Sequence, residues 1–177
     1  MKTLSFTIRA ALLGGCMALT APALLADPAP AKNWAPPAQK IYAQTLVDEA
    51  MAKHPELLSI TLHGIPPGQQ DTYTMFAGSY PDRIGNPDDP DDIDVSKKGI
   101  TILDPRWKRV NDKDKKFVVL MPLEDASHDN IGLVVYAFKS PPKPTGMERH
   151  YLDAATRLRD GLAGKIKSYD TLFDPAH

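Results

Sequence analysis

The sequence predicts an α+β domain built on a five-stranded antiparallel sheet, and three observations lead to this fold class. Residues 116–139 (KFVVLMPLEDASHDNIGLVVYAFK) hold two apolar, β-branched runs around a short polar loop, which is the pattern of a β-hairpin. Both runs are apolar on both faces, so we expect central strands of a sheet that is covered on both sides. The predicted strands follow one another between helices, which favours an antiparallel arrangement.

Length and composition are those of one ordinary globular domain with a targeting segment. The chain has 177 residues, of which 42% are hydrophobic and 24% charged. Its formal net charge of −1 gives none of the basic character that nucleic-acid binding requires. We therefore expect no nucleic-acid partner.

Residues 1–26 are predicted to be a secretory signal peptide. Lys2 and Arg9 precede the apolar run 10–25, and small residues follow at its end. The run of about 16 residues is shorter than the roughly 20 that a membrane-spanning helix needs. We expect export to the periplasm without a membrane span after signal removal, and cleavage after Ala26 or after Ala23.

Cys16 is the single cysteine of the chain and lies within this signal. The residues Leu13-Gly14-Gly15-Cys16 look like a bacterial lipobox, so lipid anchoring is one interpretation. The other is a small apolar residue of the signal core, which the apolar residues beyond Cys16 favour. In either case the mature domain contains no internal disulfide and relies on its core.

The first part of the mature chain is predicted to be a linker and a helix. Residues 27–37 (DPAPAKNWAPP) form a Pro/Ala-rich linker that we expect to be extended and mobile. Residues 38–53 carry apolar side chains at helical spacing, and His54-Pro55 ends the helix because a proline disfavours helix in the residue before it. The predicted single domain then runs over residues 38–174.

Two strands and a short helix are expected next. Residues 57–63 (LLSITLH) alternate between apolar and polar, and residues 72–79 form a second strand. Residues 91–98 are a short helix whose acidic start the helix dipole favours. A third strand over residues 99–103 ends near Trp107, and Pro105 places it at a sheet edge.

The central hairpin and a C-terminal helix complete the predicted fold. The strands are residues 117–123 and 131–138, and residues 147–166 have the three-and-four spacing of an amphipathic helix. We expect the N-terminal helix on one sheet face and the loop 81–98 on the other. The floor of a pocket would be formed by Leu120 with Tyr136, or else by Val119 with Val135.

These elements resemble the single Cache domain family, which are PAS-like extracellular sensor domains. The residues that carry the resemblance are Tyr80-Pro81-Asp82-Arg83-Ile84-Gly85 after the second strand, the Asp-rich short helix, and Met121-Pro122-Leu123-Glu124-Asp125 followed by Ile131-Gly132. The resemblance implies a pocket for small organic molecules between the sheet and the long loop. No receptor module follows Phe173, so we expect a free-standing, periplasmic, non-enzymatic member of sensor type.

The expected ligand is a small organic acid or amine, held by side chains at the meeting point of loop and sheet. Arg83 would clamp a carboxylate, or else pair with an aspartate of the loop. Trp107 and Tyr73 would stack on a ring or a cation, or else close the core. The candidate ligand-binding residues are His63, Tyr73, Met75, Arg83, Arg106, Trp107 and Tyr136.

Metal, cofactor and catalytic roles are not expected. The acidic residues 88–94 would suit calcium, but the EF-hand pattern counted from Asp89 fails, with Asp94 at its sixth place and Ile100 at its twelfth. We therefore predict a solvated loop that caps a helix, and no two histidines have metal-ligand spacing. Ser127 and His128 are neighbours that do not converge. The alternative function is an exported interaction module that docks on an envelope protein.

Overall fold

The α+β fold with its five-stranded antiparallel sheet is confirmed. The structure is a computed structural model and describes residues 31–104, 116–139 and 146–176. Its elements in chain order are α1 (Tyr42–Lys53), β1 (Leu57–Gly64), β2 (Thr74–Gly78), the 3-10 helix η1 (Pro81–Arg83), α2 (Pro90–Lys98), β3 (Ile102–Leu103), β4 (Lys116–Glu124), β5 (Asn130–Lys139), α3 (Glu148–Ala163) and the 3-10 helix η2 (Asp170–Phe173). The predicted signal peptide, Arg106 and Trp107 lie outside the described residues.

The strands are arranged in the order β2-β1-β5-β4-β3, and every neighbouring pair is antiparallel. The hairpin of β4 and β5 is central, because β1 pairs with β5 on one side and β3 with β4 on the other. The apolar character of both hairpin strands predicted this central position, which is confirmed. The short strand β3 lies at the sheet edge, as Pro105 after it indicated.

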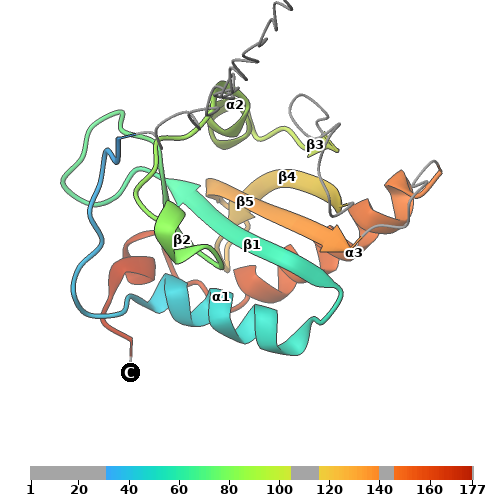
Figure 1. The fold of residues 1–177 in the computed structure, drawn as a ribbon, viewed down its shortest axis with the longest axis horizontal. Coiled ribbons are helices and arrows are strands. Elements are labelled where there is room, and N and C mark those ends of the chain that lie inside the picture. Colours follow the sequence, from blue (N-terminus) through green and yellow to red (C-terminus); the bar gives the residue numbers. More distant parts are fainter. Residues whose placement is uncertain (1–30, 105–115, 140–145, 177) are drawn as a thin grey trace, which may run out of the picture.

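The helices form two unequal layers on the sheet. Figure 1 shows α1 and α3 together below one face, with α2 above the other. The larger core lies between the sheet and the two helices α1 and α3, and it includes Leu46, Ile60, Val119 and Tyr136. The smaller core, of Val95, Leu120 and Leu133, lies between α2 and the sheet. The face that α2 covers thus has much less apolar packing.

The register of the hairpin corrects both predicted pocket floors. Val119 pairs with Tyr136, and Leu120 pairs with Val135. Directly opposed residues of an antiparallel pair point to the same face, so each predicted combination mixes one residue from each face. Tyr136 and Val119 face α1 and α3, while Leu120 and Val135 face α2.

Two element boundaries differ from the prediction. Helix α1 begins at Tyr42 and not at residue 38, because Ile41 is extended and forms a β-bridge with Pro175. Strand β3 begins at Ile102, because Gly99 adopts φ 65° and ends α2. A left-handed glycine after the last helical turn is a common helix stop.

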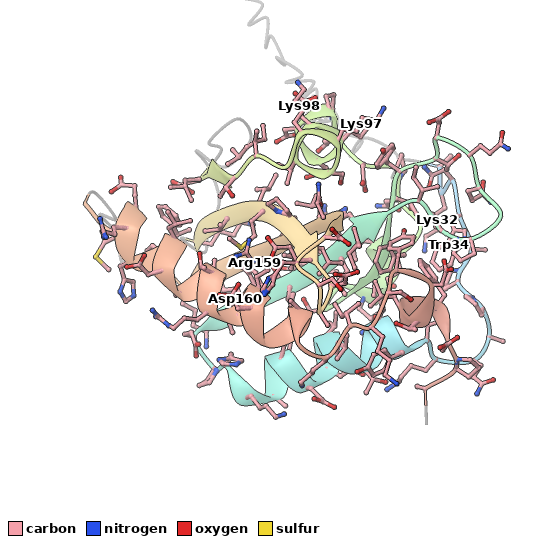
Figure 2. All side chains as sticks on the ribbon, turned by 180° about the vertical axis from the view of Figure 1, so that it is seen from behind. Lys32, Trp34, Lys97, Lys98, Arg159 and Asp160 are labelled. Carbon is pink, nitrogen blue, oxygen red and sulfur yellow. The ribbon has the colours of Figure 1, made fainter. Side chains whose placement is uncertain are left out.

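Residues 31–37 form no helix or strand, but they are not free as the linker interpretation expected. The backbone N–H of Asn33 donates to the carbonyl of Gly85 at 2.9 Å, and its side chain donates to the carbonyl of Tyr73 at 3.0 Å. The ring of Trp34 packs edge-on against Phe173, 6.3 Å between centroids. Figure 2 shows Trp34 beside the C-terminal 3-10 helix. This part of the predicted linker is therefore docked on the domain.

None of the helices in the described ranges is both long enough and apolar enough to cross a membrane.

Candidate functional site

A cleft of about 470 Å³ opens between α1 and α3 on the helix-covered side of the molecule. Its walls are apolar side chains of the two helices, and its lining also includes one residue of the sheet. The apolar lining consists of Leu46, Ala50, Ala154, Leu158, Leu162 and Tyr136. A volume of this size lies within the range of about 300–1,000 Å³ that is usual for small-molecule sites.

Tyr136, whose hydroxyl is buried, is one of the residues that line this apolar cleft. It comes from the central strand β5, and the register places it on the face of α1 and α3. The residue is 0% exposed, and its hydroxyl finds no hydrogen-bond partner within the described parts of the chain. Burial raises the pKa of Tyr136 above its ordinary value, so the phenol stays protonated and can donate. A buried hydroxyl without a partner costs about 1–3 kcal/mol.

Charged side chains surround the mouth of the cleft. Glu49 accepts hydrogen bonds from Lys165 at 2.7 Å and from Lys53 at 3.4 Å, and Lys165 and Lys53 hold the pKa of Glu49 below its ordinary value. The Oε1 atom of Glu56 lies 3.1 Å from Nδ1 of His54. Arg157 on α3 lines the same mouth, and within the described ranges it has no hydrogen bond or ion pair. It is therefore a cation that a ligand can reach.

On the opposite face, His63 lies at the centre of a second polar group. His63 comes from β1, directly after a bulge between Leu62 and His63, and is 7% exposed. Its Nε2 lies 2.7 Å from the Thr61 hydroxyl, and its Nδ1 lies 2.8 Å from Asp88 Oδ1. The side chain of Asp88 is 0% exposed, and its Oδ2 has no partner among the described residues. We call Thr61, His63, Asp88 and Asp92 the His63 cluster.

The charges of the His63 cluster influence one another. Burial alone would lower the pKa of His63, but the hydrogen bond and charge of Asp88, with the charge of Asp92, outweigh it and raise that pKa. Burial raises the pKa of Asp92 to about 6, and the negative charge of Asp88 adds to the rise. The cluster therefore concentrates negative charge around one imidazole.

The structure brings together some of the predicted site residues. Met75 pairs with His63 across strands β1 and β2 and is buried. Tyr136 lies on the other face of the sheet, so it is not part of one pocket with these two. Arg83 is exposed, and its guanidinium carbon lies 5.6 Å from the ring centroid of Tyr80. The Nζ atom of Lys97 lies 5.2 Å from the ring centroid of Tyr73.

The residues that complete these two sites do not stand out in the sequence. The sequence predicts solvated aspartates at 88–94, but Asp88 points inward to His63, 25 residues away in the chain. The expected N-capping is confirmed, since Asp89 and Asp92 form a capping box at the start of α2. Apolar spacing places Leu46 and Leu158 on the apolar faces of their helices, but no local signal indicates that the two helices share one cleft.

Comparison with known proteins gave no match: no family model fits the chain, and no curated protein or solved structure is similar to it.

Proposed function

We propose that this protein is an exported, periplasmic, non-enzymatic domain of sensor type that binds a small organic acid in the cleft between α1 and α3. The sequence left an acid and an amine open as ligand classes. The observation that carries the choice is the protonated, fully buried Tyr136 hydroxyl, which has no partner among the described residues. A phenol of this kind needs an acceptor, and a carboxylate is a strong one.

The remaining lining of the cleft supports the same ligand class. Leu46, Ala50 and Leu158 offer apolar contacts to a hydrocarbon body. Arg157 offers a positive charge to a carboxylate. Lys165 and Lys53 can keep their hydrogen bonds to Glu49 when the ligand binds. Ligand sites commonly combine apolar walls with a small number of polar groups in this way. The ligand that fits is a small aliphatic or aromatic carboxylic acid.

The Cache resemblance rests on an element order of helix, two strands, short helix, three strands and helix. The order of elements in the structure is consistent with a domain of this type. The proposal departs from the resemblance in one respect. The family would hold its ligand between the sheet and the long loop, whereas we assign the organic ligand to the opposite, helix-covered face. On the α2 side, Asp88 of the loop instead joins Thr61 and His63 of β1 and Asp92 of α2 in the compact His63 cluster.

The test is thermal and urea unfolding of the purified, tag-free protein with benzoate, with hexanoate, and with benzylamine as an amine of similar size. Ligand binding to the folded state at a hundred times the dissociation constant stabilises it by about 2.7 kcal/mol. We expect stabilisation by at least one acid and none by the amine. Absence of any shift with both acids would contradict the proposal.

Tyr136→Phe separates the ligand contact from the packing of the ring. Removal of the unpartnered hydroxyl should raise the free energy of unfolding of the ligand-free protein by about 1 kcal/mol. The same change should weaken acid binding about tenfold or more, because a hydrogen bond to a charged group contributes roughly 1.5–3 kcal/mol. Acid binding with unchanged affinity in Tyr136→Phe would place the ligand elsewhere.

Tyr151→Phe is the matched control. Tyr151 is also buried, but its hydroxyl donates to the carbonyl of Lys139 at 3.2 Å. This variant should lose stability and keep acid binding. A stable complex with an envelope protein that forms without any acid would favour the interaction module instead.

A further inference from the structure

We propose that His63, Asp88 and Asp92 form a binding site for a first-row divalent transition metal ion between β1 and the start of α2. The site lies on the sheet face opposite the α1–α3 cleft, and it is independent of the organic ligand proposed there. It adds a metal-binding function to a domain for which the sequence indicated none.

The first observation is the convergence of three ligand-type groups. One ligand atom each from His63, Asp88 and Asp92 lies within 4.8 Å of the others. Ligands that share one ion at about 2.0–2.2 Å must lie within such a distance of one another. One imidazole nitrogen and two carboxylate oxygens are a ligand set that proteins use for transition metals.

The second observation is the burial of Asp88 with one oxygen unsatisfied. Its side chain is 0% exposed, Oδ1 lies 2.8 Å from His63 Nδ1, and Oδ2 has no partner in the described parts of the chain. A structural ion pair with a protonated His63 satisfies Oδ1 and leaves Oδ2 without a donor. Burial of a charged oxygen in that state is costly. A metal ion next to the carboxylate compensates the charge of the whole group.

The third observation is the orientation of the imidazole. Nε2 of His63 lies 2.7 Å from Thr61 Oγ1, which can accept a hydrogen bond from Nε2–H. Nδ1 is then the nitrogen that faces Asp88. Histidines that bind metals commonly use one nitrogen for the ion and donate the other N–H to a neighbouring oxygen. Thr61 is thus a positioning residue for the proposed site.

The carboxylates are held by secondary structure. The backbone N–H of Asp88 donates to the carbonyl of Tyr73 at 3.2 Å, which fixes the loop beside β2. Asp92 accepts a hydrogen bond from the Asp89 backbone N–H at 3.3 Å within the capping box of α2. This bond involves Oδ2 of Asp92 and leaves Oδ1 available to an ion.

The ligand set favours transition metals over calcium and magnesium. Calcium takes six to eight oxygen ligands, and magnesium demands oxygen in octahedral geometry. A site with one imidazole suits Zn²⁺ or Mn²⁺ better. Three protein ligands leave coordination positions for water, as in zinc sites that remain open.

The test is the binding of metal by the purified, tag-free protein after treatment with a chelator. Stoichiometry is measured by elemental analysis, and affinity by calorimetry, with Zn²⁺ and Mn²⁺ alone and with Ca²⁺ and Mg²⁺ for comparison. We expect one equivalent of Zn²⁺ or Mn²⁺ and weaker binding of the other two ions. The variants are Asp88→Asn and Asp92→Asn, with circular dichroism as a check of folding.

Asp94→Asn is the matched control, because Asp94 lies on the same helix and pairs with the exposed Lys98. It should bind metal as the unaltered protein does, whereas Asp88→Asn and Asp92→Asn should lose at least about tenfold in affinity. Thr61→Val should weaken binding by about 10–100-fold, the usual cost at such positions. If Asp88→Asn does not fold, the metal affinity of Asp92→Asn alone tests the site.

Two results would overturn the site: no stoichiometric Zn²⁺ or Mn²⁺ binding by the unaltered protein, or unchanged affinity in a folded Asp88→Asn or Asp92→Asn variant. Preference for Ca²⁺ or Mg²⁺ would overturn the assigned class of ion.

Discussion

Gly132 of β5 leaves no room for a side chain beside β1. A Cβ atom at this position would lie 2.5 Å from the backbone carbonyl oxygen of His63, a distance that real Cβ contacts do not reach. Because the contact is with backbone, Gly132→Ala must push two central strands apart. We expect a loss of about 1–3 kcal/mol in the free energy of unfolding, the usual cost of overpacking, measured by urea denaturation.

Gly161→Ala is the matched control for this substitution. A Cβ atom at Gly161 meets nothing within 4 Å, and the position lies inside α3. Alanine is the better helix former there, so the control should gain up to about 1 kcal/mol. Equal unfolding midpoints for the two variants would contradict the close approach at Gly132.

Residue types could be recognised from the sequence more easily than the directions of their side chains. The sequence predicts ligand contacts for His63, Met75 and Tyr136, and all three are buried in the structure. Yet Tyr136 faces α1 and α3 while His63 and Met75 lie toward α2. In a strand that is apolar on both faces, alternation gives no sign of which residue faces which layer. Contacts with the layers settle it, because Tyr136 packs in the core on the side of α1 and α3, whereas His63 contacts Asp88 just before α2.

At the scale of elements, the turn between β4 and β5 depends on Asp125. Its Oδ1 accepts hydrogen bonds from the backbone N–H groups of Ser127 at 2.9 Å and Asp129 at 3.1 Å, and the residue is 8% exposed. Asp125→Ala leaves both donors without this partner. We expect a loss of about 1.5–3 kcal/mol in the free energy of unfolding, as for hydrogen bonds to a charged group.

Asp129→Ala provides the comparison, because Asp129 is exposed and contributes its backbone to the turn. Its free energy of unfolding should stay within about 0.5 kcal/mol of the unaltered protein, as for most surface changes. If both variants lose the same stability, the side chain of Asp125 does not organise the turn.

Helices and strands were largely predictable because their signals are local. Apolar spacing located α1, α3 and both hairpin strands, and the acidic start of α2 indicated its cap. The errors occurred at ends, where distant contacts decide. Ile41 is held extended by Pro175, which the sequence around Ile41 does not reveal.

At the scale of the whole molecule, strand order and the placement of helices create both proposed sites. β1 lies beside β5, and the loop after β2 returns over β1, so Asp88 reaches His63. α1 and α3 share one face, so Tyr136 lies between them. These are contacts between distant segments, and a single sequence carries no direct record of them. The metal-ligand group was therefore invisible as a pattern of spacing.

The two ends of the described chain close the fold together. The N–H of Tyr42 donates to the carbonyl of Asp174 at 2.8 Å, and the N–H of Ala176 donates to the carbonyl of Lys40 at 2.8 Å. Trp34 adds its edge-on contact with Phe173, next to the aromatic ring of Phe76. Residues 31–37 thus act as part of the domain and not as a separate linker.

Trp34→Ala tests this closure. The ring is partly buried against the main core, so its removal should cost less than the roughly 3–5 kcal/mol of a fully buried tryptophan, and we expect about 2 kcal/mol. Lys32→Ala, at an exposed position of the same segment, should change stability by less than about 0.5 kcal/mol. Urea denaturation measures both. A mobile linker would make the two variants equal, because neither side chain would then contribute to the folded state.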